Sequence, residues 1–549
     1  MRAIRAVWTA GLVAAAVARA QEAPPVQPPV FGETLEVRVV NLEVVVTDRD
    51  GLPVTGLGVD DFRLLVDGEP LPIRYFSEVR GGDAVGPEAV GRGSVSGIPQ
   101  IVPGTPVGSS YLVFVDDFFS IARDRDAVLR SLSEEVTGLG PEDRMAVVAW
   151  DGTALEMLTS WTQSTPDLQR AFRAAIGRKA HGLERISEAR AFGYDRQISR
   201  GFETGGRRRP LDARLNLTER QYAALIEEQV GNAVSAVAAA LRAFANPPGR
   251  KSLILLSGGW PFDPIDFAAG SFAGAFDEPG FLTSEELFRP LVATANQVGY
   301  TVYPVDVPGM VGALGRDVTA GGLSAEGNAG NAFLYETLVH WSLRHVAEET
   351  GGLALVNAER TSPLGRVAAD TRSYYWLGFV PEWQGDDADH AVAVEVRPEG
   401  LLVRGRRGFV DLSRRAETSM IVESVLVFGD GPGVRPLDLA LGEPRKAGLG
   451  RIHLPIRIEV PADEITFLPA EGGVVADLEL RMAAIDASGG RSDVPVLPVR
   501  LSAPRQPEPG EKATYATTLE LRRSKGRIVV ALYDPLSGTI WSAVADVVP

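Results

Sequence analysis

From Ser110 onward, short apolar segments alternate with longer segments in which apolar residues recur at helical spacing. Strands that are apolar on both faces are typical of parallel sheets covered by helices. The segments with strand character are Tyr111–Val115, Met145–Trp150, Ala154–Leu158, Ser252–Ser257, Thr301–Val305, Leu353–Val356 and Ser373–Phe379. The segments with helical spacing are Asp124–Thr137, Pro166–Ile176, Thr218–Phe244, Ser284–Gln297, Phe333–Glu349 and Pro363–Thr371. This alternation predicts an α/β domain over residues 109–411, built on a doubly wound, mostly parallel sheet.

The segments on either side of this region show the apolar–polar alternation of half-buried strands. We expect a small β domain over residues 33–80, a Gly-rich linker over 81–108, and a β extension of the central domain after Asp389. Beyond residue 418, short strand segments are separated by Asp-Gly, Pro-Gly and Gly-Gly turns, and the first of these segments is Ile421–Val427. Such spacing predicts a β-sandwich domain over residues 418–549.

Two insertions interrupt the central domain, at residues 178–214 and 309–330. The first is rich in Arg and Lys and lacks apolar periodicity, so we expect an exposed loop, with a dedicated anion or partner site as the alternative. Arg404, Arg406 and Arg407 make a later strand segment basic, which a strand face in water explains.

The N-terminus has the pattern of an export signal. Arg2 and Arg5 precede the apolar stretch Ala6–Ala18, and Ala18-Arg19-Ala20 fits a small-x-small cleavage site before Gln21. The apolar stretch is shorter than the roughly 20 residues that a spanning helix needs. We therefore expect residues 1–20 to be a signal peptide, and the mature chain to lie outside the cytoplasm, in the periplasm or secreted, without spanning the membrane.

The charge and composition exclude several classes of function. A net charge of −16 argues against nucleic acid as the partner, because such binding depends on basic patches. The chain has no Cys, so thiolate metal sites are excluded. It also lacks the Gly-x-Ser-x-Gly, Gly-x-x-x-x-Gly-Lys and His-Glu-x-x-His motifs of common enzyme sites, and we expect no enzymatic activity.

Several stretches in the central region resemble the von Willebrand factor type A domain, and more closely the VWFA-related subfamily of exported bacterial proteins. They are Tyr-Leu-Val-Phe-Val-Asp-Asp at 111–117, Gly-Pro-Glu-Asp-Arg-Met-Ala-Val-Val at 140–148, Gly-Arg-Lys-Ser-Leu-Ile-Leu-Leu-Ser-Gly-Gly at 249–259, Ala-Glu-Glu-Thr-Gly-Gly at 347–352 and Tyr-Tyr-Trp-Leu-Gly-Phe at 374–379. Val-Thr-Asp-Arg-Asp-Gly-Leu-Pro-Val-Thr-Gly-Leu at 46–57 is similar to the segment that precedes the domain in that subfamily. The resemblance covers residues 35–411.

The resemblance implies a metal-ion-dependent adhesion site at the carboxyl ends of the strands, with the motif Asp-x-Ser-x-Ser and a second Asp after a later strand. Asp116 and Ser120 match the first and last positions, but Phe118 replaces the middle Ser and Gly258 stands where the second Asp is expected. The site is therefore degenerate. We expect no cofactor, with Asp116 and Ser120 as the two remaining candidate ligands of a Mg²⁺ ion. Asp117 or Asp151 is the alternative replacement ligand, and Asp116 and Asp117 alternatively hold the loop or cap the next helix.

The expected function is binding of a protein partner, as in an adhesion-type module, through the loops at this rim of the sheet. The candidate contact residues are Asp116, Asp117, Ser120, Asp151, Gly258, Gly259 and Asp306. The alternative is a structural envelope scaffold that associates through its β domains. Binding rests here on analogy of fold, which by itself does not establish a function.

Overall fold

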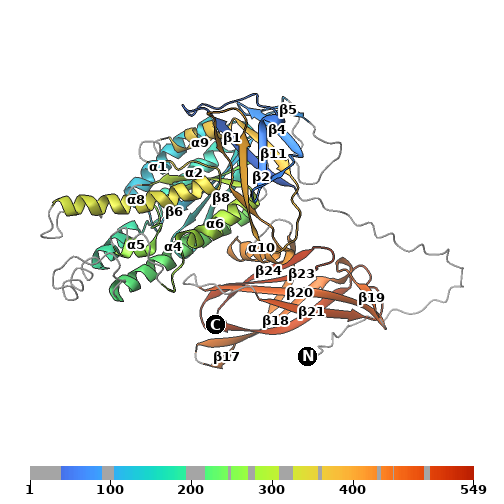
Figure 1. Ribbon diagram of the computed structural model, residues 1–549. Helices are drawn as coiled ribbons and strands as arrows, with labels where there is room; N and C mark the ends of the chain where they lie inside the picture. The colour runs from blue at the N-terminus through green and yellow to red at the C-terminus, as the bar shows by residue number, and fades with distance from the viewer. Residues whose placement is uncertain are drawn as a thin grey trace.

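The structure is a computed structural model with three connected parts, a helix-rich part, a β unit and a C-terminal pair of sheets (Figure 1). It describes residues 39–88, 104–192, 217–244, 249–269, 279–307, 325–356, 362–428, 434–448, 450–470, 472–486 and 495–548. The expected signal peptide lies outside these residues, as do most of the linker and of the two insertions.

The helix-rich part contains a five-stranded sheet with the order β10-β9-β6-β7-β8. Its strands are β6 (Ser109–Asp116), β7 (Arg144–Trp150), β8 (Leu155–Thr162), β9 (Arg250–Ser257) and β10 (Tyr300–Asp306). The pairs β10–β9, β9–β6 and β6–β7 are parallel, and β8 closes one edge antiparallel to β7. Every residue of β6 is buried, as its unbroken apolar run predicts.

Helices cover both faces of this sheet. Leu112 and Phe114 face a core shared with α4 (Leu217–Ala243), α5 (Pro264–Ala269), α6 (Ser284–Val298) and α8 (Ala325–Glu349). Tyr111, Val113 and Val115 face the opposite core, which includes α1 (Ala122–Glu135), α2 (Thr165–Ile176) and α9 (Pro363–Thr371). Because successive side chains of a strand point to opposite faces, one strand serves both cores. None of the described helices combines the length and the apolar character needed to cross a bilayer.

The β unit is built from two distant segments of the chain. One sheet has the order β13-β1-β11-β4-β5 and the other β14-β12-β2-β3. The strands are β1 (Val40–Thr47), β2 (Phe62–Val66), β3 (Glu69–Leu71), β4 (Tyr75–Arg80), β5 (Asp83–Glu88), β11 (Tyr374–Phe379), β12 (Asp389–Val396), β13 (Leu402–Arg404) and β14 (Gly408–Val410). Strand β1 pairs with β11, and β2 pairs with β12, all antiparallel. The strands expected as an extension of the central domain therefore complete the N-terminal sheets.

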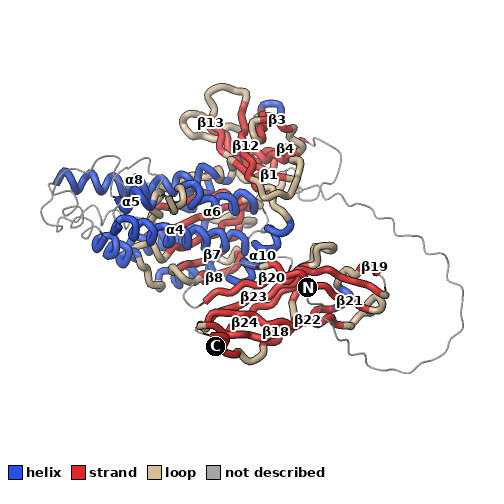
Figure 2. The backbone as a smooth tube through the Cα atoms, turned by 60° about the horizontal axis from the view of Figure 1, so that its bottom comes forward, coloured by secondary structure: helices blue, strands red, loops and turns tan. Residues whose placement is uncertain are grey.

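The C-terminal part begins with helix α10 (Arg414–Phe428), followed by two sheets around one core that holds the fully buried Trp541. The first sheet contains β15 (Val434–Pro436), β19 (Leu468–Ala470), β20 (Gly473–Asp486), β21 (Val496–Ala503), β23 (Gly526–Tyr533) and β24 (Ile540–Val547). The second contains β16 (Asp438–Leu441), β17 (Arg445–Gly448), β18 (Arg451–Pro461) and β22 (Lys512–Arg522). Helix α10 lies between α4 and strands β20, β23 and β24, and so joins this sandwich to the helix-rich part (Figure 2).

The predicted fold class, a doubly wound and mostly parallel sheet with flanking β domains, is wrong for this chain. More of the described residues lie in strands than in helices, and most strand pairs are antiparallel. Two segments assigned to the parallel sheet do not join it as strands. Strand β11 belongs to the antiparallel β unit, and the segment Leu353–Val356 contributes an isolated bridge from Leu355 to Val305.

Two local predictions are also wrong. The expected strand Ile421–Val427 is part of helix α10, where Val422, Val425 and Leu426 are buried at helical spacing. Part of the first insertion is a helix over residues 182–192 and not a loop, and its Ile186 is buried in the core.

The basic strand segment does not form a solvated face either. Arg404 pairs with Asp370, and Arg406 donates hydrogen bonds to the backbone carbonyls of Asn296 and Asn41. Arg407 contacts Glu349 at 3.1 Å. All three guanidinium groups therefore connect the β unit to the helix-rich part, in a way that strand alternation alone does not reveal.

Strands β6 and β9 begin at two glycines whose backbones are in contact. Gly249 has φ +77°, and a Cβ there would lie 1.9 Å from the carbonyl oxygen of Gly108. Gly51 has nearly the same φ, +80°, but no atom lies within 4 Å of its Cβ position. An Ala substitution at Gly51 would therefore destabilise the fold only through the left-handed backbone. The same substitution at Gly249 would add a steric clash with Gly108.

We predict that Gly51→Ala lowers the free energy of unfolding by about 1–2 kcal/mol, because only the left-handed backbone is penalised. Gly249→Ala should cost about 2 kcal/mol more, because the methyl group also forces the two strand starts apart. Urea unfolding followed by circular dichroism measures both. Equal losses in the two variants would show that the contact between Gly249 and Gly108 is not a constraint.

Candidate functional site

The rim residue Asp116 is the last residue of β6, and its carboxylate is buried with four hydrogen-bond donors. Oδ1 accepts from the backbone N–H groups of Phe118 and Phe119, each at 3.0 Å. Oδ2 accepts from Ser257 Oγ at 2.6 Å and from the indole N–H of Trp260 at 2.9 Å. Burial raises the pKa of Asp116 to about 6, against the lowering effect of these hydrogen bonds. The candidate metal ligand is thus occupied by donors from the protein itself.

The neighbouring Asp117 is also buried and is held by two arginines. Its oxygens contact Arg125 Nη1 and Arg178 Nε, each at 2.6 Å. Arg125 is fully buried on the same face of α1 as Val128, Leu129 and Leu132. Burial raises the pKa of Asp117, and the ion pairs with Arg178 and Arg125 oppose that effect. Neither arginine was predicted as a partner of Asp117. Arg125 occupies a position of α1 that is apolar in the helical pattern, and a charged residue at such a position is a signal that the sequence contains.

The predicted rim residues Asp151, Ser120 and Asp306 are buried or contact other groups of the protein. Asp151 accepts hydrogen bonds from Thr153 and Ala154 and closes the turn after β7. Ser120 is fully buried, and within the described part of the chain its hydroxyl has no hydrogen-bond partner. Asp306 is 6% exposed, with the Nε2 of His340 at 3.4 Å.

Gly258 and Gly259 lie where a larger side chain does not fit. A Cβ at Gly258 would be 2.1 Å from the carbonyl oxygen of Phe119, and one at Gly259 would be 1.8 Å from Val339. A carboxylate at position 258 would therefore require the loop after β6 to move. The structure brings Asp116 and Ser257 into contact, and leaves no room at Gly258 for the acidic ligand that the resemblance implies.

The accessible part of this rim surrounds Phe118. Its ring lies 5.4 Å from Trp150, and the guanidinium carbon of Arg185 lies 4.4 Å above it. We define the rim surface as the partly buried Phe118 and His181 together with the exposed Thr153, Lys179 and Leu183. Phe118 and Thr153 come from the loops after β6 and β7, Lys179 and His181 from the segment that follows α2, and Leu183 from the start of helix 182–192. Phe118 lies in a loop that was predicted for the rim, but Lys179, His181 and Leu183 lie in the first insertion, which was predicted as an exposed loop. Several of the predicted contact residues, among them Asp116, Asp117 and Ser120, are buried.

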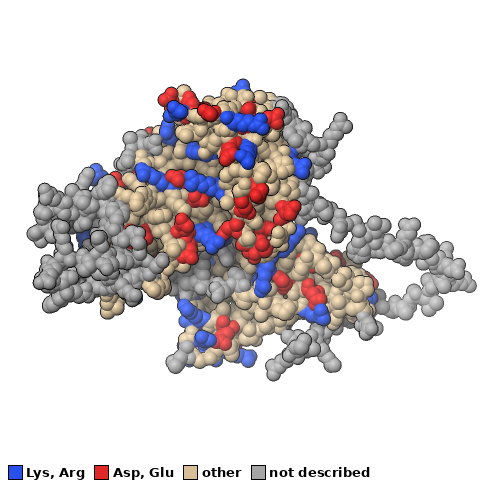
Figure 3. Space-filling model, viewed as in Figure 1, with Lys and Arg blue, Asp and Glu red and all other residues tan. Residues whose placement is uncertain are grey.

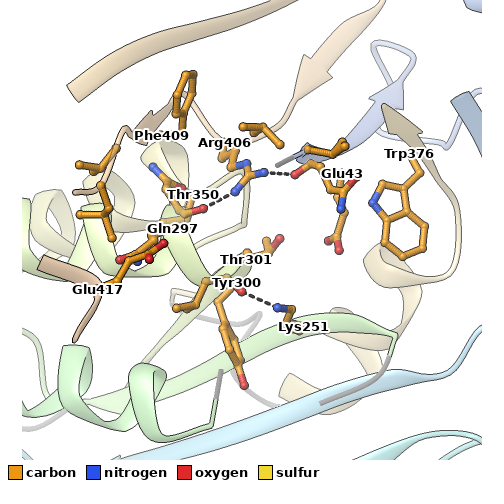
Figure 4. A pocket seen from close by; sticks show the side chains of 18 of the residues that line it. Glu43, Lys251, Gln297, Tyr300, Thr301, Thr350, Trp376, Arg406, Phe409 and Glu417 are labelled. Carbon is orange, nitrogen blue, oxygen red and sulfur yellow. Dashed lines mark hydrogen bonds between the residues drawn. The ribbon is translucent and has the colours of Figure 1, made fainter. Parts of the chain in front are cut away.

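A cavity of about 540 Å³ lies at the opposite end of the sheet, where β9 and β10 begin and the β unit meets α6 (Figure 4). Glu43, Lys251 and Arg406 face it. Lys251 Nζ donates to the Val298 carbonyl at 2.5 Å, and burial lowers the pKa of Lys251 to about 8. Burial also lowers the pKa of Arg406 to about 10, while Glu43 pairs with Arg250 at 2.9 Å. These charges are engaged with protein groups, so the cavity serves as a polar junction between two parts.

Comparison with known proteins assigns no family. No protein-family model matches the chain, and no curated protein sequence matches it. A pilus adhesin, SpaC from Lactobacillus rhamnosus GG, is 10% identical with a TM-score of 0.19, over 88% of this chain and 60% of the adhesin. The VWA domain of SpRpn10 is 7% identical with a TM-score of 0.15, over 40% of this chain and all of that domain.

A β-glucuronidase from Bacteroides uniformis is 12% identical with a TM-score of 0.15, and this chain spans only 19% of its length. All three TM-scores are far below 0.5. The chain thus has only a weak likeness to a VWA domain and to an adhesin, and this likeness assigns neither fold nor activity.

The raised pKa of Asp116 predicts a pH dependence of stability. The folded state binds the proton more tightly than an unfolded Asp, whose ordinary pKa is 3.8, so stability falls as the pH rises from 3.8 to about 6. The free energy of unfolding of the unsubstituted chain, measured relative to that of Asp116→Asn, should fall by roughly 3 kcal/mol between about pH 4 and about pH 7. Urea unfolding at several pH values measures the difference.

Asp534 is the matched control, because it is also fully buried but its pKa is lowered. Burial raises that pKa, but the hydrogen bonds from Thr466, Leu536 and Ser537 outweigh it. Relative to Asp534→Asn, the unsubstituted chain should lose stability as the pH falls below 3.8, which is the opposite sign. The same slope in both comparisons would contradict the assignment.

Proposed function

We propose that this chain is an exported, non-enzymatic protein-binding module that engages its partner through the rim surface. The observation that carries the proposal is the rigidity of the loop after β6. Asp116 and Asp117 anchor that loop from below, with four hydrogen bonds and two ion pairs of buried or partly buried groups. A surface that is already ordered loses less conformational entropy on binding.

The chemistry of the rim surface supports this proposal. Aromatic and Arg side chains dominate the binding energy of many protein interfaces, and here Phe118 lies beneath the guanidinium of Arg185. Leu183, in the first turn of the same helix as Arg185, is 63% exposed. The backbone N–H groups of His181 and Gly182 donate to the carbonyls of Asp117 and Ser120, at 2.7 and 2.9 Å, so the start of helix 182–192 is attached to the loop.

The charge distribution favours a protein partner over nucleic acid. The chain carries a net charge of −16, and on the face shown in Figure 3 basic and acidic side chains are interspersed. Phosphate backbones require a concentrated basic surface. Near the rim, Lys179 pairs with Glu184, and Arg178 pairs with Asp117 and Glu156, so basic and acidic groups are interspersed there as well.

Export and the VWFA-related resemblance complete the proposal. The segment of residues 1–20 has the three parts of a signal peptide, and the stretches at 111–117 and 249–259 carry the resemblance. Both observations come from the sequence. They favour adhesion-type binding outside the cytoplasm, without a metal ion at Asp116.

We predict that Leu183→Glu and Lys179→Glu each reduce partner recovery at least about 10-fold, because each places a negative charge on the rim surface. The measurement is recovery of proteins from an envelope extract of the source cells by the immobilised chain, quantified by mass spectrometry. The control is Leu536→Glu, at a leucine of the C-terminal sandwich that is 56% exposed.

Unchanged recovery with both rim variants would refute binding at the rim surface. Loss of recovery with Leu536→Glu alone would instead favour the alternative, a scaffold that associates through its β domains. Circular dichroism of each variant separates a loss of contact from a loss of fold.

A further inference from the structure

Three side chains of the β unit come together outside the rim. Asp386, His390 and Asp411 offer ligand atoms that all lie within 4.8 Å of one another. His390 is near the start of β12, Asp411 directly follows β14, and Asp386 lies in the loop before β12. The antiparallel pairing of His390 with Phe409 brings these segments together.

Asp411 has an unpartnered oxygen in the protein interior. The residue is 2% exposed. Its Oδ2 accepts from the backbone N–H groups of Gln384 and Gly385, at 2.5 and 2.9 Å, but its buried Oδ1 has no hydrogen-bond partner among the residues that the structure describes. A buried carboxylate oxygen without a donor is costly, and a cation is one of the few groups that remove this cost.

His390 is oriented as a metal ligand is. Its Nδ1 lies 2.7 Å from Oδ2 of Asp67, and its ring stacks on Phe409 with centroids 4.9 Å apart. An imidazole that donates its Nδ1 proton to a carboxylate presents the lone pair of Nε2 on its other side.

Backbone strain is concentrated at the same place. Among the described residues, Asp67 and Asp387 are the two non-glycine residues with positive φ, at 50° and 62°. Asp67 orients His390, and Asp387 follows Asp386 and accepts hydrogen bonds from the backbone and hydroxyl of Ser413. Such conformations persist where the surroundings hold them, often at functional sites.

We propose that Asp386, His390 and Asp411 bind a divalent transition-metal cation of the Zn²⁺ type, outside the degenerate rim site. One imidazole with two carboxylates suits Zn²⁺, whereas Mg²⁺ and Ca²⁺ prefer oxygen ligands alone. Zn²⁺ with ligands at about 2.1 Å needs them roughly 3.4 Å apart, so the most widely separated ligand atoms must move closer by up to about 1.4 Å. Asp386 is exposed, so its side chain has room for this movement, whereas His390 is held by Asp67 and Phe409.

Three protein ligands leave one position of a tetrahedral site open. His390 also lines a cavity of about 670 Å³ between α6 and β14. The cation would therefore connect the loop of Asp386 to the end of β14, and would still be open to water or to a carboxylate from outside.

The test is titration of the full chain, after removal of metal with a chelator, with ZnCl₂, MnCl₂ and CaCl₂ in separate calorimetric experiments. We expect one Zn²⁺ per chain and a higher melting temperature in its presence. Asp386→Asn and His390→Gln should each weaken Zn²⁺ binding at least 10-fold. Asp67→Asn should weaken it by about 10- to 100-fold, as removal of a partner of a ligating His does.

The matched control is His453→Gln, at a histidine on β18 whose side chain is 51% exposed. It should leave the affinity unchanged. Asp386 is exposed, so its variant tests the site without disturbing the core. No saturable Zn²⁺ binding, tighter binding of Ca²⁺ than of Zn²⁺, or equal affinity in Asp386→Asn, His390→Gln and His453→Gln would each overturn the proposal.

Discussion

The pairing of β1 with β11 is the constraint on which the arrangement of the whole chain depends. It places Val40 opposite Phe379. The whole five-stranded sheet and the helices that cover it lie between these two residues in the sequence, so the pairing brings together the two ends of that long segment. The entropic cost of bringing the ends of a segment together grows only slowly with its length. Burial of enough apolar surface in the β unit can therefore offset the cost of this pairing. The β unit supplies that surface with Leu42, Val44 and Leu377, which are almost fully buried. Arg250, Arg404 and Arg406 then bind across the junction with the helix-rich part.

Three buried carboxylates show three ways in which this fold accommodates charge. Asp116 is surrounded by hydrogen-bond donors, and Asp117 is paired with arginines. Asp411 keeps one oxygen without a partner. The first two arrangements are complete within the chain and stabilise the loop beneath the rim surface. The third is incomplete, and the proposed cation site rests on that difference.

Several strands of the five-stranded sheet in the helix-rich part lie where the sequence predicted strands. The segments predicted around Tyr111–Val115, Met145–Trp150 and Ser252–Ser257 correspond to β6, β7 and β9. The prediction failed at the segment 374–379, which is equally apolar but pairs antiparallel in the β unit. The apolar residues of a short strand indicate that the strand is buried, but not which strands it pairs with. The predicted fold class was therefore wrong, although many of the predicted elements were correct. The helix at 414–428 was missed because Val422, Val425 and Leu426 also fit a short strand pattern.

For the candidate sites, the sequence by itself determined which residue types are available. It identified Asp116 and Ser120, and it showed that Phe118 and Gly258 remove two of the implied metal ligands. Only the tertiary structure decided that Ser257 and Trp260 occupy the carboxylate of Asp116, and that a side chain at position 258 does not fit. Only the tertiary structure brings Asp386, His390 and Asp411 together with Asp67. The physical reason is that ligand geometry and desolvation depend on strand register and on contacts between distant segments, which no local pattern of residues encodes.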